Sequence, residues 1–387
     1  VRWTENRNMQ AYLELLAEKK INFSSLVDGR YSLDDAALAY EALNSSKKPL
    51  AVLLSYPASI LEDKKAETFI YLPSIDQRKD IIDGKIETGI IGLGSFAQVV
   101  HLPNLLKLKN LFHLRGICTS DQVKAKYFGK KYQAEIAATD YKEILKDPKI
   151  NLVIITTRHN LHAQIVKDAL MAGKNVFVEK PLCLNMAELE EILATLKEVN
   201  KNGNYPVLAV GFNRRFSPLA KKAKEIISGR RNPLLIYYRV NDTYLPPNHW
   251  VNTAEGGGRI LGNACHMFDL FQYFIGSPVK EVKILTIETQ GTFYLPTDNF
   301  SALLKFKDGS MSNLLYTTEG SEQLPKEYLE IYSEGRVLIL NDFKELKTFG
   351  LREGMKTRRT AKGHLEELKT LGECLKQKKW PIPLEEI

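Results

Sequence analysis

A glycine-rich turn between an apolar strand and an apolar helix constrains this chain more than any other feature of its sequence. Residues 85–91, KIETGII, predict a short buried strand, and the turn GLGSFA follows directly at 92–97. Apolar residues then recur with helical spacing as far as Leu108. In this strand–turn–helix context, a G-x-G-x-x-A turn is typical of a dinucleotide-binding site. Gly92 permits the tight turn, Gly94 lets a pyrophosphate approach the backbone, and Ala97 lets the helix pack closely on the strand.

The same turn places the start of a helix where a phosphate would bind. Ser95 and Phe96 open that helix, and the N–H groups and positive dipole end of a helix attract anions. A plain strand–helix connection without any nucleotide has the same local pattern. The regular alternation of strands and helices after the turn favours the nucleotide-binding interpretation.

Strands and helices alternate from the turn to residue 210. Strands are predicted at 112–119, 151–156, 175–178 and 206–210, with helices at 121–131, 159–172 and 186–199 between them. The run NLVIIT at 151–156 is almost wholly apolar, as expected for a strand covered on both faces. The pattern predicts a doubly wound parallel sheet, a Rossmann domain over residues 85–210.

The rhythm changes after Gly211. Helices are predicted at 217–227, 264–274 and 364–378, and strands at 234–241, 282–288, 300–306, 311–317 and 329–333. Turn signals at Asp308-Gly309 and Glu334-Gly335 separate some of these strands. Residues 211–387 are therefore expected to form an α+β domain with an open, mostly antiparallel sheet.

Length and charge exclude several classes of protein. The 387 residues suffice for two domains. The net charge of +8 comes from scattered Lys and Arg without aromatic interleaving, so no nucleic-acid partner is expected. No apolar run approaches the roughly 20 residues of a membrane span, and the polar start VRWTEN is not typical of a signal peptide. A first residue of Val instead of Met suggests a trimmed or partial chain.

The four cysteines, Cys118, Cys183, Cys265 and Cys374, lie far apart in apolar or helical contexts. Their spacing fits no metal site, and free thiols in a reducing cytoplasm are expected. His159 and His162 are three residues apart, but no carboxylate or cysteine accompanies them. We therefore expect no metal and a cytoplasmic location.

Three further motifs belong to the same edge of the predicted sheet. Glu179-Lys180-Pro181 follows the strand at 175–178, and GFNRRFSP begins at the end of the strand at 206–210. Ligands of open α/β sheets bind at the carboxyl ends of strands, so both motifs should lie near the glycine turn. The third motif, GGGRILGNACHMFD at 256–269, opens a helix of the second domain and is expected to close over that edge.

Together these motifs resemble the glucose–fructose oxidoreductase / inositol dehydrogenase (Gfo/Idh/MocA) family. The resemblance runs from Lys85 to Pro383 and rests on GLGSFA, TTRHNLH at 156–162, EKP, and the GGG run followed by His266. It implies a Rossmann domain joined to an open-sheet substrate domain that also forms dimers or tetramers. It also implies NAD or NADP as cofactor, and sugars, inositols or nucleotide sugars as substrates.

The resemblance assigns catalysis to Lys180 and His266. Lys180 borders nicotinamide and substrate in the family, and the Lys180–Pro181 peptide is expected to be cis. We expect His266 to act as base and Lys180 to stabilise an alkoxide, although a desolvated lysine can exchange roles with the histidine. A solvated strand-end lysine and an ordinary helix histidine are the structural alternatives.

The other candidate residues fall into two groups. The cofactor group contains Gly92, Gly94, Ser95, Phe96, Ala97, Thr119, Ser120, Thr157, Arg158, His159, His162, Glu179, Lys180 and Pro181. The substrate group contains Asn213, Arg215, Asn241, His249, Trp250 and Asn263. Structural ion pairs are the alternative for Arg214 and Arg215, and core anchoring is the alternative to sugar stacking for Trp250.

Two departures from the family pattern bear on the reaction. Gly262 stands where the family has an Asp four residues before the histidine, and Ala264 replaces a Gly, so Asn263 is the nearest polar substitute. The end of the second strand reads Cys118-Thr119-Ser120, where many relatives have an acidic residue for the adenosine ribose. Asp121 is expected to begin the next helix, and the choice between NAD and NADP stays open.

Residues 1–57 resemble a different family. A helix at 6–19, a capped helix after Ser32, and the strand PLAVLLS at 49–55 resemble the carboxyl-terminal tail of medium-chain, zinc-type alcohol dehydrogenases. None of that family's zinc ligands is present, so the resemblance implies a structural remnant of an upstream fused dehydrogenase domain. An unrelated helical extension is the alternative. Residues 58–84 lack periodicity and are expected to be a linker that wraps the following domain.

Three functions therefore compete. The first is an NAD(P)-dependent oxidoreductase that moves a hydride between nicotinamide and a sugar, polyol or nucleotide-sugar hydroxyl. The second is a glycosidase or lyase on the same fold that retains NAD and accumulates no NADH. The third is a non-catalytic nucleotide-binding module, which the loss of the acidic group at Gly262 would suit.

Overall fold

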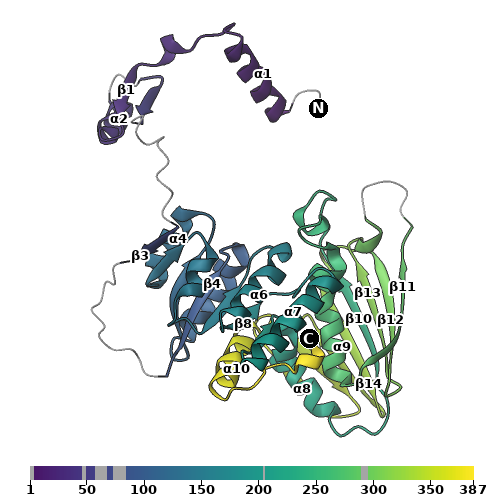
Figure 1. Ribbon diagram of the computed structural model, residues 1–387. Helices are drawn as coiled ribbons and strands as arrows, with labels where there is room; N and C mark the ends of the chain where they lie inside the picture. Colours follow the sequence, from purple (N-terminus) through teal and green to yellow (C-terminus); the bar gives the residue numbers. More distant parts are fainter. Residues whose placement is uncertain (1–3, 46–48, 57–67, 73–83, 204, 289–294) are drawn as a thin grey trace. The chain divides into compact units, whose positions relative to one another are not determined.

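The computed structural model describes residues 4–45, 49–56, 68–72, 84–203, 205–288 and 295–387. The chain divides into two units, residues 1–67 and 68–387 (Figure 1). Among the described residues, no helix is both long and apolar enough to cross a membrane. The candidate site lies within the second unit.

The second unit begins with a seven-stranded sheet in the order β3-β6-β5-β4-β7-β8-β9. Its strands are β3 (Phe69–Tyr71), β4 (Ile86–Ile91), β5 (Phe112–Cys118), β6 (Ile136–Ala138), β7 (Leu152–Ile155), β8 (Asn175–Val178) and β9 (Leu208–Val210). All neighbours are parallel except β3, which is antiparallel to β6. The predicted doubly wound parallel sheet is confirmed.

Helices cover both faces of this sheet. They are α3 (Leu102–Lys107), α4 (Gln122–Tyr132), α5 (Tyr141–Lys146), α6 (His162–Met171), α7 (Met186–Lys201) and the carboxyl-terminal α10 (His364–Lys376). Ile154 packs in one core with α3 and α10, whereas Val153 and Ile155 pack in another with α5, α6 and α7. Figure 1 shows α6 and α10 beside the strands of this sheet. This two-sided burial explains the apolar run in β7.

One strand of the sheet comes from the expected linker. β3 pairs with the edge strand β6, and Leu72 after it packs against Ala125 and Ala137. A Cβ at Gly129 would lie 2.4 Å from Cδ1 of Leu72, so any larger residue here would displace the Leu72 side chain. Part of the segment therefore covers the sheet edge, while residues 57–67 and 73–83 lie outside the described part of the chain.

The rest of the second unit is an eight-stranded sheet in the order β11-β12-β13-β10-β14-β15-β16-β17. Its strands are β10 (Leu235–Asn241), β11 (Val279–Thr286), β12 (Phe300–Phe306), β13 (Met311–Thr317), β14 (Glu327–Ser333), β15 (Arg336–Asn341), β16 (Glu345–Phe349) and β17 (Met355–Lys356). Only the β10–β13 pair is parallel. The predicted open, mostly antiparallel sheet is confirmed.

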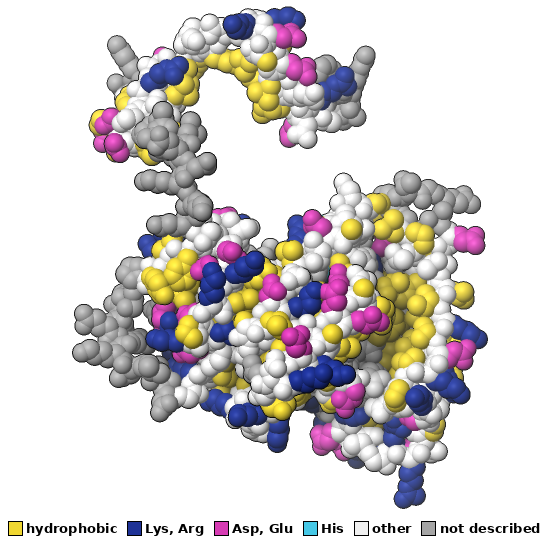
Figure 2. All heavy atoms as spheres, in the orientation of Figure 1, with side chains coloured by type: hydrophobic (Ala, Val, Ile, Leu, Met, Phe, Trp, Pro, Cys, Tyr) yellow, Lys and Arg dark blue, Asp and Glu magenta, His cyan; other side chains and the backbone are white. Residues whose placement is uncertain are grey.

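Helices cover one face of this second sheet. α8 (Pro218–Ile227) and α9 (Cys265–Ile275) share a core with side chains from β10, β12, β13, β14 and β15. Leu285, Leu303 and Leu315 remain exposed. Figure 2 shows hydrophobic side chains gathered on the part of the sheet around β10 to β12. The prediction that this sheet forms an oligomer interface stays a prediction.

The first unit is small and has almost no core. It contains α1 (Glu5–Ala17), β1 (Gly29–Ser32), α2 (Ala36–Leu43) and β2 (Val52–Ser55), with β1 parallel to β2. Among its described residues only Ala39 is buried. The expected helices and closing strand are present, and β1 is an additional strand that the sequence pattern did not predict.

Candidate active site

The glycine turn has the geometry that a dinucleotide site needs. Gly92 has φ +96°, and a Cβ there would lie 2.8 Å from the Thr156 carbonyl, so only glycine fits. Gly94 differs, because no other residue lies within 4 Å of where its Cβ would be. The backbone at Gly94 is therefore open to a ligand, as the sequence predicted.

The helix start beside Gly94 is also accessible. Ser95 and Phe96 are exposed, whereas Ala97 is fully buried between helix and sheet. The helix then makes a π-helical turn, Ala97–His101, before α3 begins. Exposed N–H groups at a helix start suit a phosphate, and π-helical turns are frequent at functional sites.

The end of β5 carries the two hydroxyl residues predicted for the adenosine ribose. Thr119 is half-buried and its N–H donates to the Ala138 carbonyl over 3.1 Å, whereas Ser120 is exposed. Asp121 caps α4 by accepting from the Lys124 N–H over 3.0 Å. Asp121 therefore begins the helix, as expected, and Thr119 and Ser120 remain the candidate ribose contacts.

The segments after β7 and β8 are joined by a buried histidine. The His162 ring lies between two carbonyl oxygens, with Nδ1 2.7 Å from that of Pro181 and Nε2 3.1 Å from that of Thr157. The Lys180–Pro181 peptide is cis, as the sequence predicted. A neutral imidazole carries one N–H, and the shorter contact of His162 ties the Lys180–Pro181 segment to the start of α6.

Lys180 reaches from the first sheet into the second domain. Its ammonium group donates to the carbonyl oxygen of Gly262. Gly262 lies in a second π-helical turn, Ile260–Ala264, which leads into α9. The helix thereby presents His266 four residues after the carbonyl that holds Lys180. The structure brings the two predicted catalytic residues to the same end of the sheet.

His266 is buried and neutral. The ring lies beside Phe212, and its Nδ1 is buried without a hydrogen-bond partner in the described part of the chain. Burial lowers the pKa of His266 well below its usual value, and the nearby charges of Arg214 and Lys180 lower it further. An uncharged imidazole with a free nitrogen can accept a proton.

A loop of the second domain packs on the strand end that follows β7. Arg158 donates to Glu255 over 2.9 Å and lies over the Trp250 ring at 4.6 Å. His159 lies 4.9 Å from the Trp250 ring centroid, and its Nδ1 is 2.8 Å from the Gly256 carbonyl oxygen. These contacts hold the two domains of the second unit together above the sheet.

Comparison with known proteins identifies the family. Residues 86–204 match the model of an oxidoreductase family with an NAD-binding Rossmann fold, GFO_IDH_MocA, and residues 228–336 match the GFO/IDH/MocA C-terminal domain. The chain belongs to the Gfo/Idh/MocA family. The resemblance of residues 1–57 to alcohol dehydrogenases is not matched by these findings.

Curated relatives cover part of the chain. The chain is 34% identical over 200 residues to an uncharacterized oxidoreductase of Bacillus subtilis, which is 51% of this chain and 56% of that protein. It is 29% identical over 229 residues to the myo-inositol 2-dehydrogenase of Thermotoga maritima, with coverage of 58% and 66%. The chain thus matches between about half and two thirds of these relatives' lengths.

Solved structures share the fold over a longer stretch. A probable dehydrogenase from Thermotoga maritima superposes with a TM-score of 0.63 at 26% identity, covering 76% of this chain and 90% of that one. A levoglucosan dehydrogenase in complex with NADH and levoglucosan gives a TM-score of 0.65 at 20% identity, covering 77% and 92%. The second comparison supports the fold alone.

This Gfo/Idh/MocA chain has a backbone carbonyl where the sequence resemblance implied a carboxylate. Gly262 offers only its carbonyl to Lys180. A Cβ at Gly262 would lie 3.2 Å from Cε1 of His159, so a side chain here would press on that ring. The His159 ring therefore occupies part of the space that an aspartate side chain would need.

Four predicted substrate residues have polar partners within the protein. Arg215 is ion-paired with Asp269 and Glu386, and Asn213 donates to the Lys362 carbonyl over 2.8 Å. Asn241 donates to the carbonyl oxygens of Ser321 and Leu324. Asn263 donates to Asp242 and Tyr316. These partners give the four side chains structural contacts, and their roles in substrate binding stay predictions.

The loop residues His249 and Trp250 are also engaged. Nδ1 of His249 accepts from the Val251 N–H over 3.3 Å, and its ring lies 6.0 Å from Trp250. Trp250 is half-buried and contacts Arg158 and His159, which favours the anchoring alternative, and its sugar stacking stays a prediction. Arg214 forms a structural ion pair, the alternative given above for this residue, because its guanidinium donates two hydrogen bonds to buried Glu327.

Sequence reasoning missed a buried carboxylate and two histidines. Asp242 follows β10 and accepts from Tyr316, Asn263 and Lys326, which fixes Asn263 beside Gly262. His101, at the end of the π-helical turn before α3, and His364, at the start of α10, both lie near Glu179. No local pattern marks these residues, because their partners lie from 21 to 185 positions away in the sequence.

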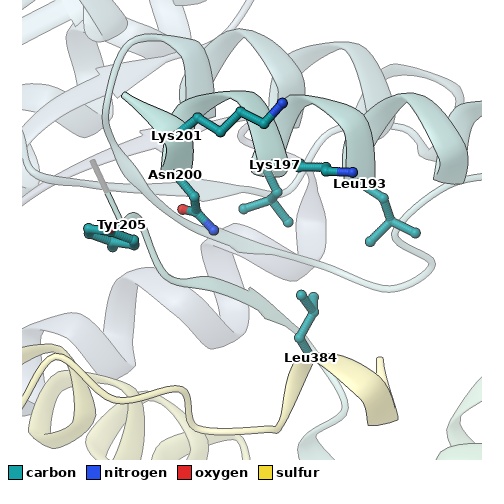
Figure 3. A pocket seen from close by; sticks show the side chains of 7 residues that line it. Leu193, Lys197, Asn200, Lys201, Tyr205 and Leu384 are labelled. Atoms are coloured by element: carbon teal, nitrogen blue, oxygen red, sulfur yellow. The ribbon is translucent and has the colours of Figure 1, made fainter. Parts of the chain in front are cut away.

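A surface pocket of about 470 Å³ lies apart from these residues. Its lining comes from the carboxyl-terminal part of α7, the segment after it, and the chain end, as Figure 3 shows for Lys197, Asn200 and Leu384. None of its lining residues belongs to the candidate site. The pocket therefore carries no part of the functional assignment.

Three buried histidines and one half-buried histidine near the site have lowered pKa values: His159, His162 and His266, and His364. Burial is the largest cause in each case, because a low-dielectric surrounding disfavours the imidazolium form. The pKa falls to about 4 for His159 and for His364. Two buried carboxyl groups shift oppositely, since burial raises the pKa of Asp269 to about 6 and that of Glu367 well above its usual value.

The protein should therefore lose stability as the pH falls from 6.5 to 5. A histidine whose pKa is lower when folded binds fewer protons in the folded state, so the free energy of unfolding falls with pH below about 6.5. His159 and His364, whose pKa falls to about 4, each contribute a loss of about 2 kcal/mol over this interval. His162 and His266 add to this loss, which the two carboxyl groups oppose. Thermal unfolding should give a lower Tm at pH 5. His364→Phe keeps a ring beside Phe96 and should flatten the dependence, and an unchanged slope would contradict this explanation.

Proposed function

We propose that the chain is an NAD(P)-dependent oxidoreductase that transfers a hydride between nicotinamide and a hydroxyl-bearing carbon of a sugar, polyol or nucleotide sugar. The observation that carries the proposal is the contact between the Lys180 ammonium and Gly262, four residues before His266. The contact places the Lys180 cation near the helix that carries the neutral His266 imidazole, at the carboxyl ends of the strands that follow the glycine turn. The name of the Thermotoga maritima relative, a myo-inositol 2-dehydrogenase, supports the polyol class.

The residues present fit the dinucleotide. Gly94 leaves open space beside the turn, and Ser95 and Phe96 are exposed at a helix start, where a pyrophosphate would be bound. Thr119 and Ser120 would hold the adenosine ribose, or the 2′-phosphate of NADP. The bound nicotinamide supplies the hydride acceptor and donor, whereas the protein supplies position and electrostatics.

The chain's own residues then handle the proton. Oxidation of a carbinol releases a hydroxyl proton, and His266 is neutral at pH 7 because burial and nearby cations disfavour its charged form. The Lys180 ammonium stabilises the developing alkoxide charge, since it has three donors and only one is needed for Gly262. Asn263 is held by Asp242 and Tyr316 and keeps the π-helical turn in place.

A second function has one specific observation in its favour. Gly262 stands where the family pattern has an aspartate, so the chain lacks that carboxylate. A glycosidase or lyase that retains NAD would tolerate this loss, and so would a module that binds a nucleotide without turnover. The distinguishing measurement is the product balance for a panel of inositols, sugars and nucleotide sugars incubated with NAD or NADP. Reduced cofactor equal to oxidised product supports the oxidoreductase, whereas cleaved product without reduced cofactor supports the alternative.

Ligands for that assay can be selected by thermal shift. A dinucleotide or substrate present at about 100 times its Kd should stabilise the folded protein by about 2.7 kcal/mol. A folded protein that gains stability from neither NAD(H) nor NADP(H) would contradict the proposed function. A gain with one cofactor only would also assign its specificity.

We further propose that the protein is a cytoplasmic homodimer or homotetramer. The four free cysteines suit a reducing compartment. Leu285 is 78% exposed on β11, with Leu303 and Leu315 on the strands beside it, and such a surface favours association with a second copy. Light scattering of the wild type and of Leu285→Glu tests this assembly, and a monomeric wild type would contradict it.

We propose that residues 1–57 are the end of a fused, dehydrogenase-like domain and have a structural role in this chain. Parallel strands are normally covered on both faces, yet Leu50, Leu53 and Tyr56 around β2 are all exposed. The resemblance to the tail of zinc-type alcohol dehydrogenases supports this reading, although no comparison reported above matches the segment.

Removal of residues 1–56 should leave cofactor binding unchanged, because the site lies wholly within the second unit and β3 is retained. The truncated chain should also self-associate less, since the segment exposes many apolar side chains. NADH titration and size-exclusion chromatography of the two proteins measure both effects. A truncated protein that binds no cofactor but stays folded would contradict this division.

A further inference from the structure

A buried histidine–carboxylate pair lies directly behind Lys180. Nε2 of His101 is 2.7 Å from Oε1 of Glu179, and the His101 side chain is 1% exposed and that of Glu179 12%. Burial alone would raise the pKa of Glu179, but the His101 hydrogen bond and the nearby charges lower it overall. Glu179 is therefore ionised at neutral pH, which requires the His101 Nε2 to carry the proton and to donate it.

His101 has no other polar partner. Its Nδ1 is buried without a hydrogen bond in the described part of the chain. The ring instead makes edge contacts with Phe96 at 5.3 Å and with Phe177 at 5.6 Å between centroids. Phe96 belongs to the glycine turn and Phe177 to β8, so the imidazole spans the cofactor turn and the strand that ends at Lys180.

The Glu179 carboxylate has little freedom to move away. A Cβ at Gly211 would lie 3.0 to 3.1 Å from the carboxylate atoms, so the group packs against the backbone at the end of β9. The Glu179 N–H donates to the Ile155 carbonyl over 2.9 Å. On the other side of Lys180, the Pro181 carbonyl is held by His162. Both neighbours of Lys180 are thus fixed by buried histidines.

We propose that His101 is a positioning residue: through the Glu179 carboxylate it fixes the segment that carries Lys180 in register with the cofactor-binding turn. The π-helical turn Ala97–His101 brings the imidazole inward from the helix that follows the glycine turn. The role in hydride transfer rests on the proposed function. The placement of the Lys180 ammonium does not, so it can be measured without any substrate.

His101→Leu removes the donor and His101→Gln retains a donor at the position of Nε2. The matched control is His113→Leu, because His113 also pairs with a carboxylate at the other end of the sheet, with its Nδ1 2.8 Å from Glu87.

The first readout is the rate of reductive methylation of Lys180, measured by mass spectrometry in the absence of substrate. His101→Leu should label about fivefold faster or more, because the segment opens more often. His101→Gln and His113→Leu should label like the wild type.

The second readout is turnover with saturating cofactor. His101→Leu should lose about 10- to 100-fold in kcat while the cofactor Kd changes by less than about threefold, and His101→Gln should recover most of the loss. If His101→Leu does not fold, the comparison uses His101→Asn, whose shorter amide cannot reach Glu179 as Gln can. Wild-type labelling of Lys180 in the Leu or Asn variant would overturn the inference. A wild type that binds no dinucleotide would instead overturn the proposed function, and the labelling result would still decide the role of His101.

Discussion

Lys180→Met should lower kcat by about 10²- to 10⁴-fold while the cofactor Kd stays nearly unchanged. The ammonium is the cation at this edge of the sheet that reaches Gly262, and its charge stabilises an alkoxide in the transition state more than it stabilises the neutral hydroxyl. Methionine keeps the length and the apolar stem of lysine but cannot donate or carry charge. Steady-state kinetics together with NADH titration separate these two effects.

The matched control for Lys180→Met is Lys197→Met. Lys197 lies on α7 and lines the surface pocket away from the site, so its loss should change neither kcat nor cofactor binding (Figure 3). His266→Ala should lower kcat over the same range as Lys180→Met, because it removes the proton acceptor. Turnover at the wild-type rate in both site variants would show that the catalytic assignment is wrong, whereas the cofactor site would still stand.

Gly92→Ala and Gly94→Val should separate folding from cofactor binding. Gly92 has a left-handed φ and no room for a Cβ beside Thr156, so alanine there should cost about 2 to 5 kcal/mol of stability. Gly94 has open space and no such φ, so valine should leave the Tm nearly unchanged and abolish dinucleotide binding by filling the pyrophosphate position. Thermal unfolding and NADH titration of both variants measure the two effects. Equal losses of Tm would contradict the distinct roles of the two glycines.

The parallel sheet could be predicted because burial on both faces leaves a continuous apolar run in the sequence. Residues 151–156 illustrate this, since β7 is central and covered by helices on both sides. β3 and β6 could not be predicted in the same way. Each has three residues, and β3 is stabilised by pairing with β6 and by Leu72 against Gly129, which are contacts across the fold.

The candidate site was predictable only where a motif constrains the backbone. Gly92 and the Lys180–Pro181 peptide need special geometry and Gly94 belongs to the same turn motif, so sequence alone indicates their positions. Asn213 and Arg215 carry no such signal. Their partners, which include Asp269 and the carbonyl of Lys362, lie far along the chain, so only the folded structure shows that they stabilise the protein.

His101 is a further residue whose contacts could not be predicted from the sequence. In the sequence it is a histidine within an apolar helix, which is more often a core residue than a functional one. The pairing with Glu179 forms only in the folded chain, where the π-helical turn before α3 lies beside the end of β8. Local pattern cannot encode a contact between residues 78 positions apart.

The central claim is that the glycine turn binds a nicotinamide dinucleotide next to Lys180. Fluorescence titration with NADH and NADPH tests it most directly, with Gly94→Val as the folded negative control. We expect saturable binding of at least one dinucleotide, one per chain, to the wild type and to Lys180→Met, and none to Gly94→Val at an unchanged Tm. A folded wild type that binds neither dinucleotide, or a Gly94→Val variant that binds as the wild type does, would contradict the claim.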